Sequence, residues 1–258
     1  MSVQAQFAEI ARGGGRAALV TAMKGPRAGA RILVRVDGSS EGTLGDPELD
    51  AEAQSHAQEL IWTEQSEMRG DLFVDISAPA PRIVIFGAVE YADHLSRLAK
   101  AAGWRAYVVD PRGRFATAER FPEAEEVIAG WPDKAFEQIG EPDPATYIAV
   151  LTHDPKLDDA ALLVALRSEA PYIGAMGSTR AQKERRERLL AAGVADEELE
   201  RISAPIGLDL GATSAQETAL SIMAEVAAVR HGREGGRLCK GPKGSIHSQA
   251  EGVPAGKG

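Results

Sequence analysis

The sequence of 258 residues contains a single cysteine, Cys239. One cysteine excludes an internal disulfide and any metal site built from several cysteines. The sequence also lacks a run of about 18 apolar residues, so it offers no transmembrane helix. Its first residues, MSVQAQFAEIARGGGR, do not show the charged and then apolar pattern of a secretion signal. From these absences we expect a cytoplasmic protein with no membrane partner.

Positive charge is scarce as well. The chain has 29 Lys and Arg against 38 Asp and Glu, which gives a formal net charge of −9. A general nucleic-acid binder needs a basic surface, so we expect no nucleic-acid partner. A small anionic ligand is not excluded, because overall charge says little about one local site. The 44% hydrophobic content and the length suit one large domain or two small ones.

The first 76 residues mix strand-like segments with a helix. Strands are predicted at 17–22, 30–36 and 72–76. The pair Asp37-Gly38 is typical of a hairpin turn. Asp46, followed by Pro47 and Glu48, indicates the start of a helix, because Asp caps helices and Pro suits their first turn. These patterns predict a small α+β domain.

Strands and helices alternate after that point. Strands are predicted at 83–86, 105–109, 126–129, 147–151 and 172–175, and helices near 91–102, 158–168, 178–192 and 214–231. Such alternation indicates an α/β domain with a Rossmann-like, doubly wound parallel sheet.

The predicted domains have definite limits. The smaller domain takes residues 1–76, and the segment SAPAP at 77–81 has the composition of a stiff linker. The Rossmann-like domain takes residues 82–232. Residues 233–258 are rich in Gly, Lys and Ser and lack apolar periodicity, so we expect them to form a flexible tail.

The segment IVIFGAVEYADHL at 83–95 resembles the start of a dinucleotide-binding fold. The fingerprint G-x-G-x-x-G/A requires a second glycine so that the backbone approaches a pyrophosphate, but Val89 stands there after Gly87 and Ala88. Asp110 follows Gly87 by 23 residues, close to the spacing of a ribose-binding carboxylate. A tight turn without a ligand is the alternative for Gly87. We expect a nucleotide-type ligand in a pose other than that of NAD.

His153 and Asp154 follow the fourth predicted strand of this domain. Ligands of doubly wound sheets bind beyond the carboxyl ends of the strands, where the first and fourth strands meet. The pair could therefore contact a ligand or act as acid and base. Equally, Asp154-Pro155 could start a turn, with His153 as a satisfied loop residue. No second histidine follows at ligand spacing, so we predict no metal site and assign no catalytic residue.

A second glycine-rich turn, GAMGSTR at 174–180, joins a strand to a helix. Free backbone N–H groups at a helix start suit an anion. Arg180 opposes the helix dipole in the first turn, which suggests an anion nearby. The alternative is a solvated face balanced by acidic residues, and we expect that face for the later basic residues, Lys183, Arg185, Arg186 and Arg188.

The segment PIGLDLGA at 205–212 is a third candidate loop. Two glycines flank Asp209, which we expect to be buried. The loop could face the same ligand site, or it could be the connection that aims the last helix.

Three long motifs carry a resemblance to a known family. FATAERFPEAEEV (115–127), THDPKLDDAALLVALRSEAPYIGAMGS (152–178) and APIGLDLGATSAQETALSIMAEVAAVR (204–230) resemble the XdhC/CoxI family. Members are accessory proteins of molybdenum hydroxylases such as xanthine dehydrogenase and carbon monoxide dehydrogenase. They bind the molybdenum cofactor, protect it during sulfuration by a cysteine desulfurase, and deliver it to the apoenzyme.

The resemblance implies a cofactor chaperone or maturation factor rather than an enzyme. Its cargo would be molybdopterin or the cytidine dinucleotide form, and its partners an apo molybdenum hydroxylase and a cysteine desulfurase. The resemblance leaves open whether the protein forms a homodimer. An NAD(P)-binding oxidoreductase with a degenerate fingerprint is the alternative, and a regulatory or scaffold protein is a third.

The sequence departs from the family at two places. Many relatives have G-A-G-H-V where this chain has GAVEY at 87–91, and Gly-Gly-Cys where it has LGDPE at 44–48. The first domain therefore lacks a thiol that could contact the cofactor. Because the turn at 87–91 departs from the family pattern, any phosphate is expected near residues 177–180. The predicted cofactor-binding residues are Gly87, Ala88, Val89, Asp110, His153, Asp154, Gly174, Gly177, Ser178, Arg180 and Asp209.

Overall fold

The computed structural model describes residues 1–240. The chain divides into two compact units, Met1–Pro81 and a second that begins at Arg82. The division falls at the last residue of the predicted linker. Residues 241–258, most of the expected tail, lie outside the described residues.

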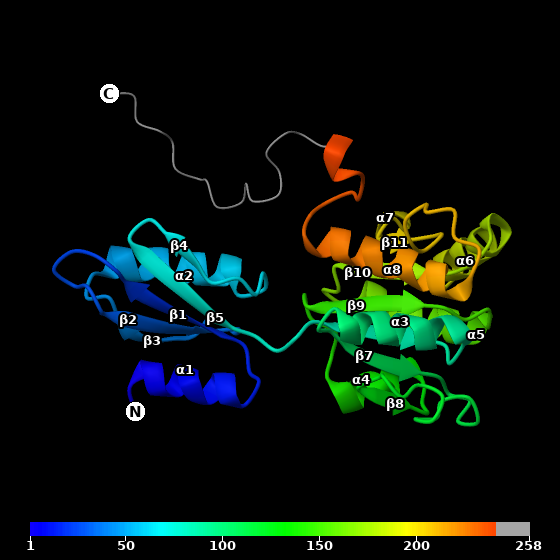
Figure 1. Ribbon diagram of the computed structural model, residues 1–258, viewed down its shortest axis with the longest axis horizontal. Helices are drawn as coiled ribbons and strands as arrows, with labels where there is room; N and C mark the ends of the chain where they lie inside the picture. The colour runs from blue at the N-terminus through cyan, green and yellow to red at the C-terminus, as the bar shows by residue number, and fades with distance from the viewer. Residues whose placement is uncertain (241–258) are drawn as a thin grey trace. The chain divides into compact units, whose positions relative to one another are not determined.

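The first unit is an antiparallel sheet with one helix on each face (Figure 1). Its strands are β1 (Ala17–Ala22), β2 (Arg31–Arg35), β3 (Ser40–Thr43), β4 (Glu67–Arg69) and β5 (Leu72–Ser77), in the order β3-β2-β1-β5-β4. Side chains alternate between the two faces of a strand. Accordingly, Ala18 and Val20 of β1 pack under helix α2 (Pro47–Leu60), while Ala17 and Leu19 pack under α1 (Val3–Arg12).

Asp46 confirms the predicted start of α2. Its side chain accepts a hydrogen bond from the backbone N–H of Glu48 over 2.9 Å. This bond satisfies one of the N–H groups that lack a helical partner at the start of a helix.

The second unit contains a parallel sheet of six strands. They are β6 (Arg82–Phe86), β7 (Arg105–Val109), β8 (Glu126–Ile128), β9 (Thr146–Val150), β10 (Tyr172–Ala175) and β11 (Ile202–Ser203), in the order β11-β10-β9-β6-β7-β8. The first strand of the unit therefore lies between the second and the fourth, as the prediction required. This is the strand order of a doubly wound nucleotide-binding fold.

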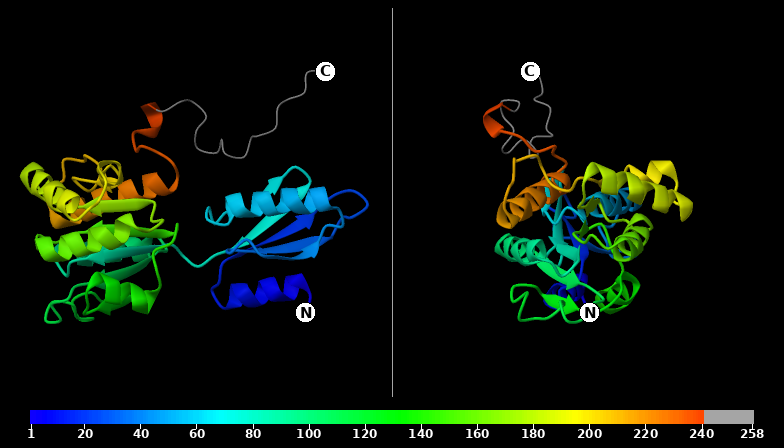
Figure 2. Two further views of the ribbon diagram at one scale, coloured as in Figure 1. Left: turned by 180° about the vertical axis from the view of Figure 1, so that it is seen from behind. Right: turned by 90° about the vertical axis from the view of Figure 1, so that its right-hand side faces the viewer.

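Helices cover both faces of this sheet (Figures 1 and 2). One layer holds α3 (Glu90–Ala101) and α8 (Ala215–Arg230), and the other holds α4 (Pro132–Ile139), α5 (Pro155–Leu166) and α6 (Thr179–Ala191). All five residues of β6 are buried, because a strand covered on both faces has no solvated side. The predicted fold class, a Rossmann-like domain preceded by a smaller α+β unit, is confirmed.

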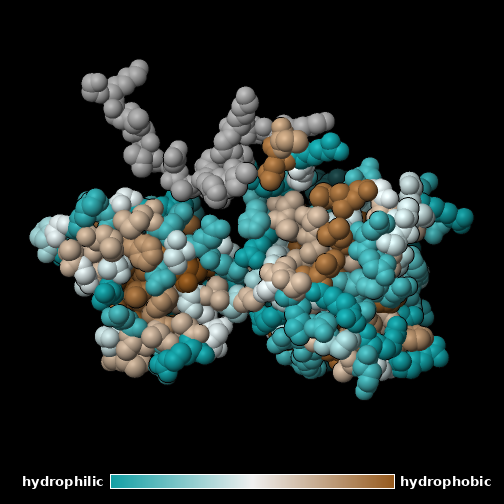
Figure 3. Space-filling view, in the orientation of Figure 1, coloured by the Kyte–Doolittle hydropathy of each residue, from teal (hydrophilic) through white to brown (hydrophobic). Residues whose placement is uncertain are grey.

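Two short helices complete the described chain, α7 (Asp196–Leu199) and the 3-10 helix η1 (Leu238–Lys240). Within residues 1–240, no helix has the length and apolarity that a membrane span requires. Both units expose a mixture of hydrophilic and hydrophobic residues (Figure 3).

Candidate functional site

Four loops follow neighbouring strands at the carboxyl edge of the parallel sheet. They are residues 87–89 after β6, 110–112 after β7, 152–154 after β9 and 176–178 after β10. We call them the switch-point loops, because the order of the strands reverses between β6 and β9 and ligands of such sheets bind there. They bring together eight of the predicted residues: Gly87, Ala88, Val89, Asp110, His153, Asp154, Gly177 and Ser178.

Gly87 makes the close approach of two of these loops possible. Its φ is +114°, a backbone conformation that favours glycine. A Cβ added there would lie 2.8 Å from Cγ2 and 3.2 Å from the backbone nitrogen of Thr152. Thus the loop after β9 occupies the space that a side chain would need. Val89 caps α3 without a side-chain hydrogen bond, and its side chain packs against the core under that helix.

Asp110 is fully buried at the end of β7. Its Oδ2 accepts hydrogen bonds from the backbone N–H of Ala88 at 2.9 Å and from Nη2 of Arg112 at 2.7 Å. Its Oδ1 accepts from the backbone N–H and from Nε of Arg112, both at 2.9 Å. Burial raises the pKa of Asp110, but these hydrogen bonds outweigh it and hold the pKa below its ordinary value. The carboxylate is therefore charged and has four donors within the protein.

Asp154 is the N-cap of α5. Its Oδ1 accepts from the backbone N–H of Lys156 over 3.0 Å, and α5 begins at Pro155, three residues before the predicted start at 158. Asp154 thus has a local structural role at the start of α5, which is in line with the alternative that Asp154-Pro155 starts a turn. His153 is exposed beside it. A ligand contact by either residue stays a prediction.

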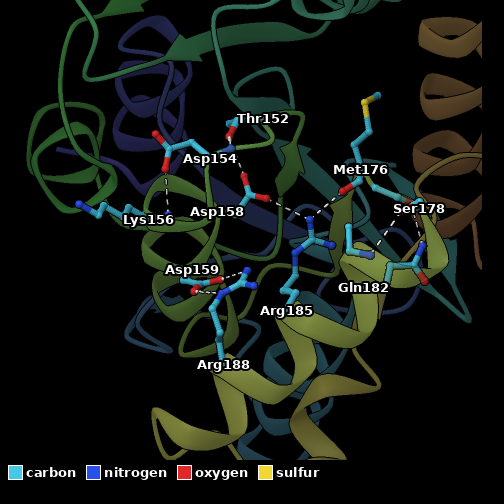
Figure 4. Close-up of polar contacts among 12 residues, drawn as sticks. Thr152, Asp154, Lys156, Asp158, Asp159, Met176, Ser178, Gln182, Arg185 and Arg188 are labelled. Atoms are coloured by element: carbon cyan, nitrogen blue, oxygen red, sulfur yellow. Dashed lines mark hydrogen bonds and ion pairs between the residues drawn. The ribbon is translucent and has the colours of Figure 1, made fainter.

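A buried network joins the loops after β9 and β10 (Figure 4). Oγ1 of Thr152 donates to Oδ1 of Asp158 over 2.8 Å, and Nη2 of Arg185 donates to Oδ2 of Asp158 over 3.0 Å. The same Nη2 donates to the carbonyl oxygen of Met176 over 2.7 Å. Burial raises the pKa of Asp158 above its ordinary value, although the bonds from Thr152 and Arg185 oppose it. The buried ion pair of Asp158 and Arg185 therefore joins helices α5 and α6 beneath the switch-point loops.

Two of the four arginines of α6, Arg180 and Arg185, lie opposite to expectation. The sequence predicts Arg185 on a solvated face, but the residue is only 4% exposed, so that prediction is wrong. The reason is helical spacing: Arg185 lies four residues before the buried Leu189, on the face towards the sheet. Arg180 has a side chain that is 89% exposed and pairs with Glu184 over 2.8 Å, which is the alternative considered for it.

Gly174 and Asp209 lie apart from the switch-point loops. Gly174 is inside β10, where a Cβ would meet Cδ1 of Ile206 at 2.5 Å and the hydroxyl of Tyr172 at 2.6 Å. Packing alone thus accounts for glycine at this position. Asp209 is exposed, so the expectation of burial is wrong; its Oδ1 accepts from the N–H of Gly211 within the loop.

The described residues hold no metal centre of protein side chains. Within residues 1–240, no three or more His, Cys, Asp or Glu side chains are grouped to bind an ion.

Comparison with known protein families gives a match within each of the two units. Residues 83–226 match the XdhC Rossmann domain, more than half of the 258 residues, and residues 10–70 match the XdhC and CoxI family. This chain belongs to the XdhC and CoxI family. The resemblance of its three sequence motifs is thereby confirmed.

Two named relatives point to molybdenum enzymes by their descriptions. The molybdenum cofactor insertion chaperone PaoD of Escherichia coli is 31% identical over 152 residues, covering 59% of this chain and 41% of that protein. A Bacillus subtilis protein described as a probable xanthine dehydrogenase subunit is 28% identical over 160 residues, covering 62% of this chain and 46% of that protein. The chain spans less than half the length of these curated relatives.

A solved structure shares the fold of this XdhC protein. It is described as a xanthine dehydrogenase from Bacillus halodurans, with 24% identity and a TM-score of 0.60. The match covers 91% of this chain and 64% of that one. At this identity the likeness shows the fold alone.

The XdhC Rossmann domain also carries three arginines that sequence reasoning missed. The guanidinium carbons of Arg112, Arg114 and Arg120 lie 5.1, 4.5 and 5.7 Å from the ring centroid of Phe115, in the segment after β7. Hydrogen bonding to Asp110 raises the pKa of Arg112, and Asp154 adds to the increase. The signal was available as three arginines within nine residues of an acidic protein.

Proposed function

We propose that this protein binds the molybdenum cofactor at the switch-point loops and delivers it to an apo molybdenum hydroxylase of the xanthine or carbon monoxide dehydrogenase type. The observation that carries the proposal is the match to the XdhC Rossmann domain, together with the similarity to a relative named as a molybdenum cofactor insertion chaperone. A second relative is named as a component of a probable xanthine dehydrogenase, which supports a hydroxylase partner.

The chemistry of the switch-point loops suits an anionic ligand such as molybdopterin or its cytidine dinucleotide form. Arg112 brings a cation to the edge of the sheet with its side chain 41% exposed, and α6 begins there with its N-terminal N–H groups. The predicted binding residues at this edge, Gly87 and Ser178 among them, remain part of the proposal. So do Gly174, Arg180 and Asp209, which lie outside the loops.

We propose that the protein acts as a cofactor chaperone rather than as an enzyme. His153, the candidate acid or base, is exposed beside the helix cap Asp154. The role left to the protein is to hold the cofactor, shield it from water and release it to a partner.

We also infer that any sulfur added to the bound cofactor comes from a partner, a cysteine desulfurase. Cys239 is the one thiol of the sequence, and it is exposed in η1 near the end of the described residues. Substitution Cys239→Ser is expected to leave maturation of the hydroxylase unchanged. A hydroxylase that loses its sulfurated cofactor with this variant would show that the protein itself relays sulfur.

The function is tested by isolating the protein from cells that synthesise molybdopterin. We expect the purified protein to release a fluorescent oxidised pterin, and an apo-hydroxylase to gain activity when mixed with it. Protein from cells unable to make molybdopterin is the control. Absence of pterin, with the hydroxylase maturing equally well without this protein, would refute the proposal.

A further inference from the structure

Helix α6 starts at the carboxyl edge of the sheet, directly after the loop that follows β10. Ser178 is its N-cap and accepts a hydrogen bond from the N–H of Ala181 over 3.3 Å. The first N–H that bonds within the helix is that of Gln182, which donates to the carbonyl oxygen of Ser178, so the N–H groups of Thr179 and Arg180 have no acceptor in the helical ladder. A helix of 13 residues thus directs N–H groups and the positive end of its dipole at this edge. This alone does not define a site.

A buried arginine lies beneath the same turn. Arg185 uses Nη2 for both of its hydrogen bonds, to Asp158 and to the carbonyl of Met176. Its Nε and Nη1 are buried without a hydrogen-bond partner among the described residues. Arginine stays protonated in proteins, so a buried guanidinium N–H without an acceptor is costly. Such groups call for a partner that residues 1–240 do not supply.

The direction of the Arg185 side chain links it to the turn. Side chains of a helix point towards its N-terminus, and Figure 4 shows the guanidinium of Arg185 below the loop that contains Met176 and Ser178. A Cβ added to Gly177 would lie 3.6 Å from Nη2 and 3.9 Å from Nη1 of Arg185. Because Gly177 has no side chain, no Cβ stands between this turn and the guanidinium. Its φ of +145° also favours glycine.

We propose that residues 177–180, with Arg185 beneath them, form the site for the phosphate group of the cofactor. One phosphate oxygen accepts hydrogen bonds from the N–H groups at the start of α6. Another accepts from Nη1 of Arg185, through the space that a side chain at Gly177 would occupy. Arg185 is thus the arginine that binds the anion at this turn, a role that the sequence suggested for Arg180. The inference rests on the proposed function for the identity of the ligand, but the site itself is tested with inorganic phosphate.

The test removes the charges of the pair while keeping its hydrogen-bonding groups. Asp158→Asn combined with Arg185→Gln is compared with Asp159→Asn combined with Arg188→Gln. The second pair is the matched control: Nε of Arg188 lies 2.6 Å from Oδ2 of Asp159, and the pair joins the same two helices. Phosphate binding to the full-length protein is measured by calorimetry at constant ionic strength, with chloride as the reference salt.

We expect saturable phosphate binding by the wild type and at least about a tenfold loss in the Asp158/Arg185 variant, because charge-assisted hydrogen bonds to phosphate are strong. The control variant should stay within about twofold, since its ion pair is more exposed. Absence of saturable binding by the wild type would overturn the inference. An equal loss in both variants would do the same.

A single variant keeps the test valid if the double variant does not fold. Arg185→Lys retains the charge but removes the planar fork of donors, and we expect weaker phosphate binding with the far-ultraviolet circular dichroism unchanged. Unaltered phosphate affinity in this variant would overturn the site.

The pterin assay separates this inference from the proposed function. If the Asp158/Arg185 variant carries as much pterin as the wild type, the site is wrong and the function stands. If phosphate binding depends on Arg185, but the wild type carries no pterin and the hydroxylase matures equally well without it, the function is wrong and the site stands.

Discussion

The backbone N–H of Ala88 donates to Oδ2 of Asp110 over 2.9 Å, at the turn where a dinucleotide-binding fold offers its amides to a pyrophosphate. Arg112 supplies the remaining three donors to the same carboxylate. The amide of Ala88, which would contact the pyrophosphate, is thus hydrogen-bonded to the carboxylate of Asp110, which would contact the ribose. This pairing counts against the NAD(P)-binding oxidoreductase and gives Asp110 a structural role.

The first prediction concerns NADH. Calorimetric titration of the wild type should give no heat of binding at micromolar NADH, because Asp110 already has four donors. Asp110→Ala should leave that result unchanged and lower the free energy of unfolding by about 1–3 kcal/mol, since the buried N–H of Ala88 loses its acceptor. Micromolar binding that disappears in Asp110→Ala would instead establish a dinucleotide site.

The second prediction concerns acid. The folded protein holds the pKa of Asp110 below its ordinary value of 3.8, because its hydrogen bonds outweigh burial. A carboxyl with a depressed pKa contributes stability above the pKa of the unfolded chain and loses it as the pH falls through the folded value. The stability difference between wild type and Asp110→Asn should therefore be constant from pH 7 to 5 and shrink below the ordinary pKa. Urea unfolding across this range measures it, and a difference that grows in acid would contradict the assignment.

The third prediction concerns Gly87. An alanine there would place its Cβ 2.8 Å from Cγ2 of Thr152 in a backbone conformation with φ of +114°. We expect Gly87→Ala to lower the free energy of unfolding by about 2–4 kcal/mol, from strain and overpacking together. Chemical unfolding monitored by tryptophan fluorescence provides the measurement.

Gly113 provides the control for that substitution. It lies in the segment after β7, its φ is outside the glycine region, and an added Cβ would meet Cβ of Ala129 at an ordinary 3.6 Å. Gly113→Ala should change stability by less than about 1 kcal/mol. Equal losses from the two substitutions would show that the approach of Thr152 does not determine the residue at 87.

Hydrophobic patterning predicted the second unit well because its strands are buried on both faces. The predicted strands at 105–109 and 172–175 agree with the ends of β7 and β10. The sequence did not reveal β3, whose four residues are all exposed and show no apolar alternation. Its position depends on pairing with β2, a contact between strands that local composition does not encode.

The candidate site was predicted less completely than the fold. The loops were found because glycine and Asp after apolar strands indicate strand ends, and the strand order brought them together. Residue type could not show which of the four arginines of α6 is buried, since all four carry the same charge. Helical spacing from Leu189 distinguishes Arg185, but its partner Asp158 belongs to another helix, so the buried pair follows from packing of α5 on α6.

The fourth prediction concerns the loop that precedes α8. The hydroxyl of buried Tyr172 and the N–H of Gly207 both donate to Oε2 of Glu225. Glu225→Ala should lower the free energy of unfolding by about 1–3 kcal/mol, more than Tyr172→Phe, because it leaves two donors without an acceptor. Equal effects of the two substitutions would show that the hydrogen bond from the N–H of Gly207 to Glu225 adds nothing to stability.

Alkaline pH tests the same pair independently. Burial, and then the bond to Glu225, raise the pKa of Tyr172 far above its ordinary value of 10.0, so the folded phenol keeps its proton. A raised pKa contributes stability below the unfolded value and loses it as the pH rises beyond that value. The stability advantage of the wild type over Tyr172→Phe should thus be constant from pH 7 to 9 and decline above 10. An advantage that increases at high pH would mean that the phenol ionises in the folded state and that Glu225 is not its acceptor.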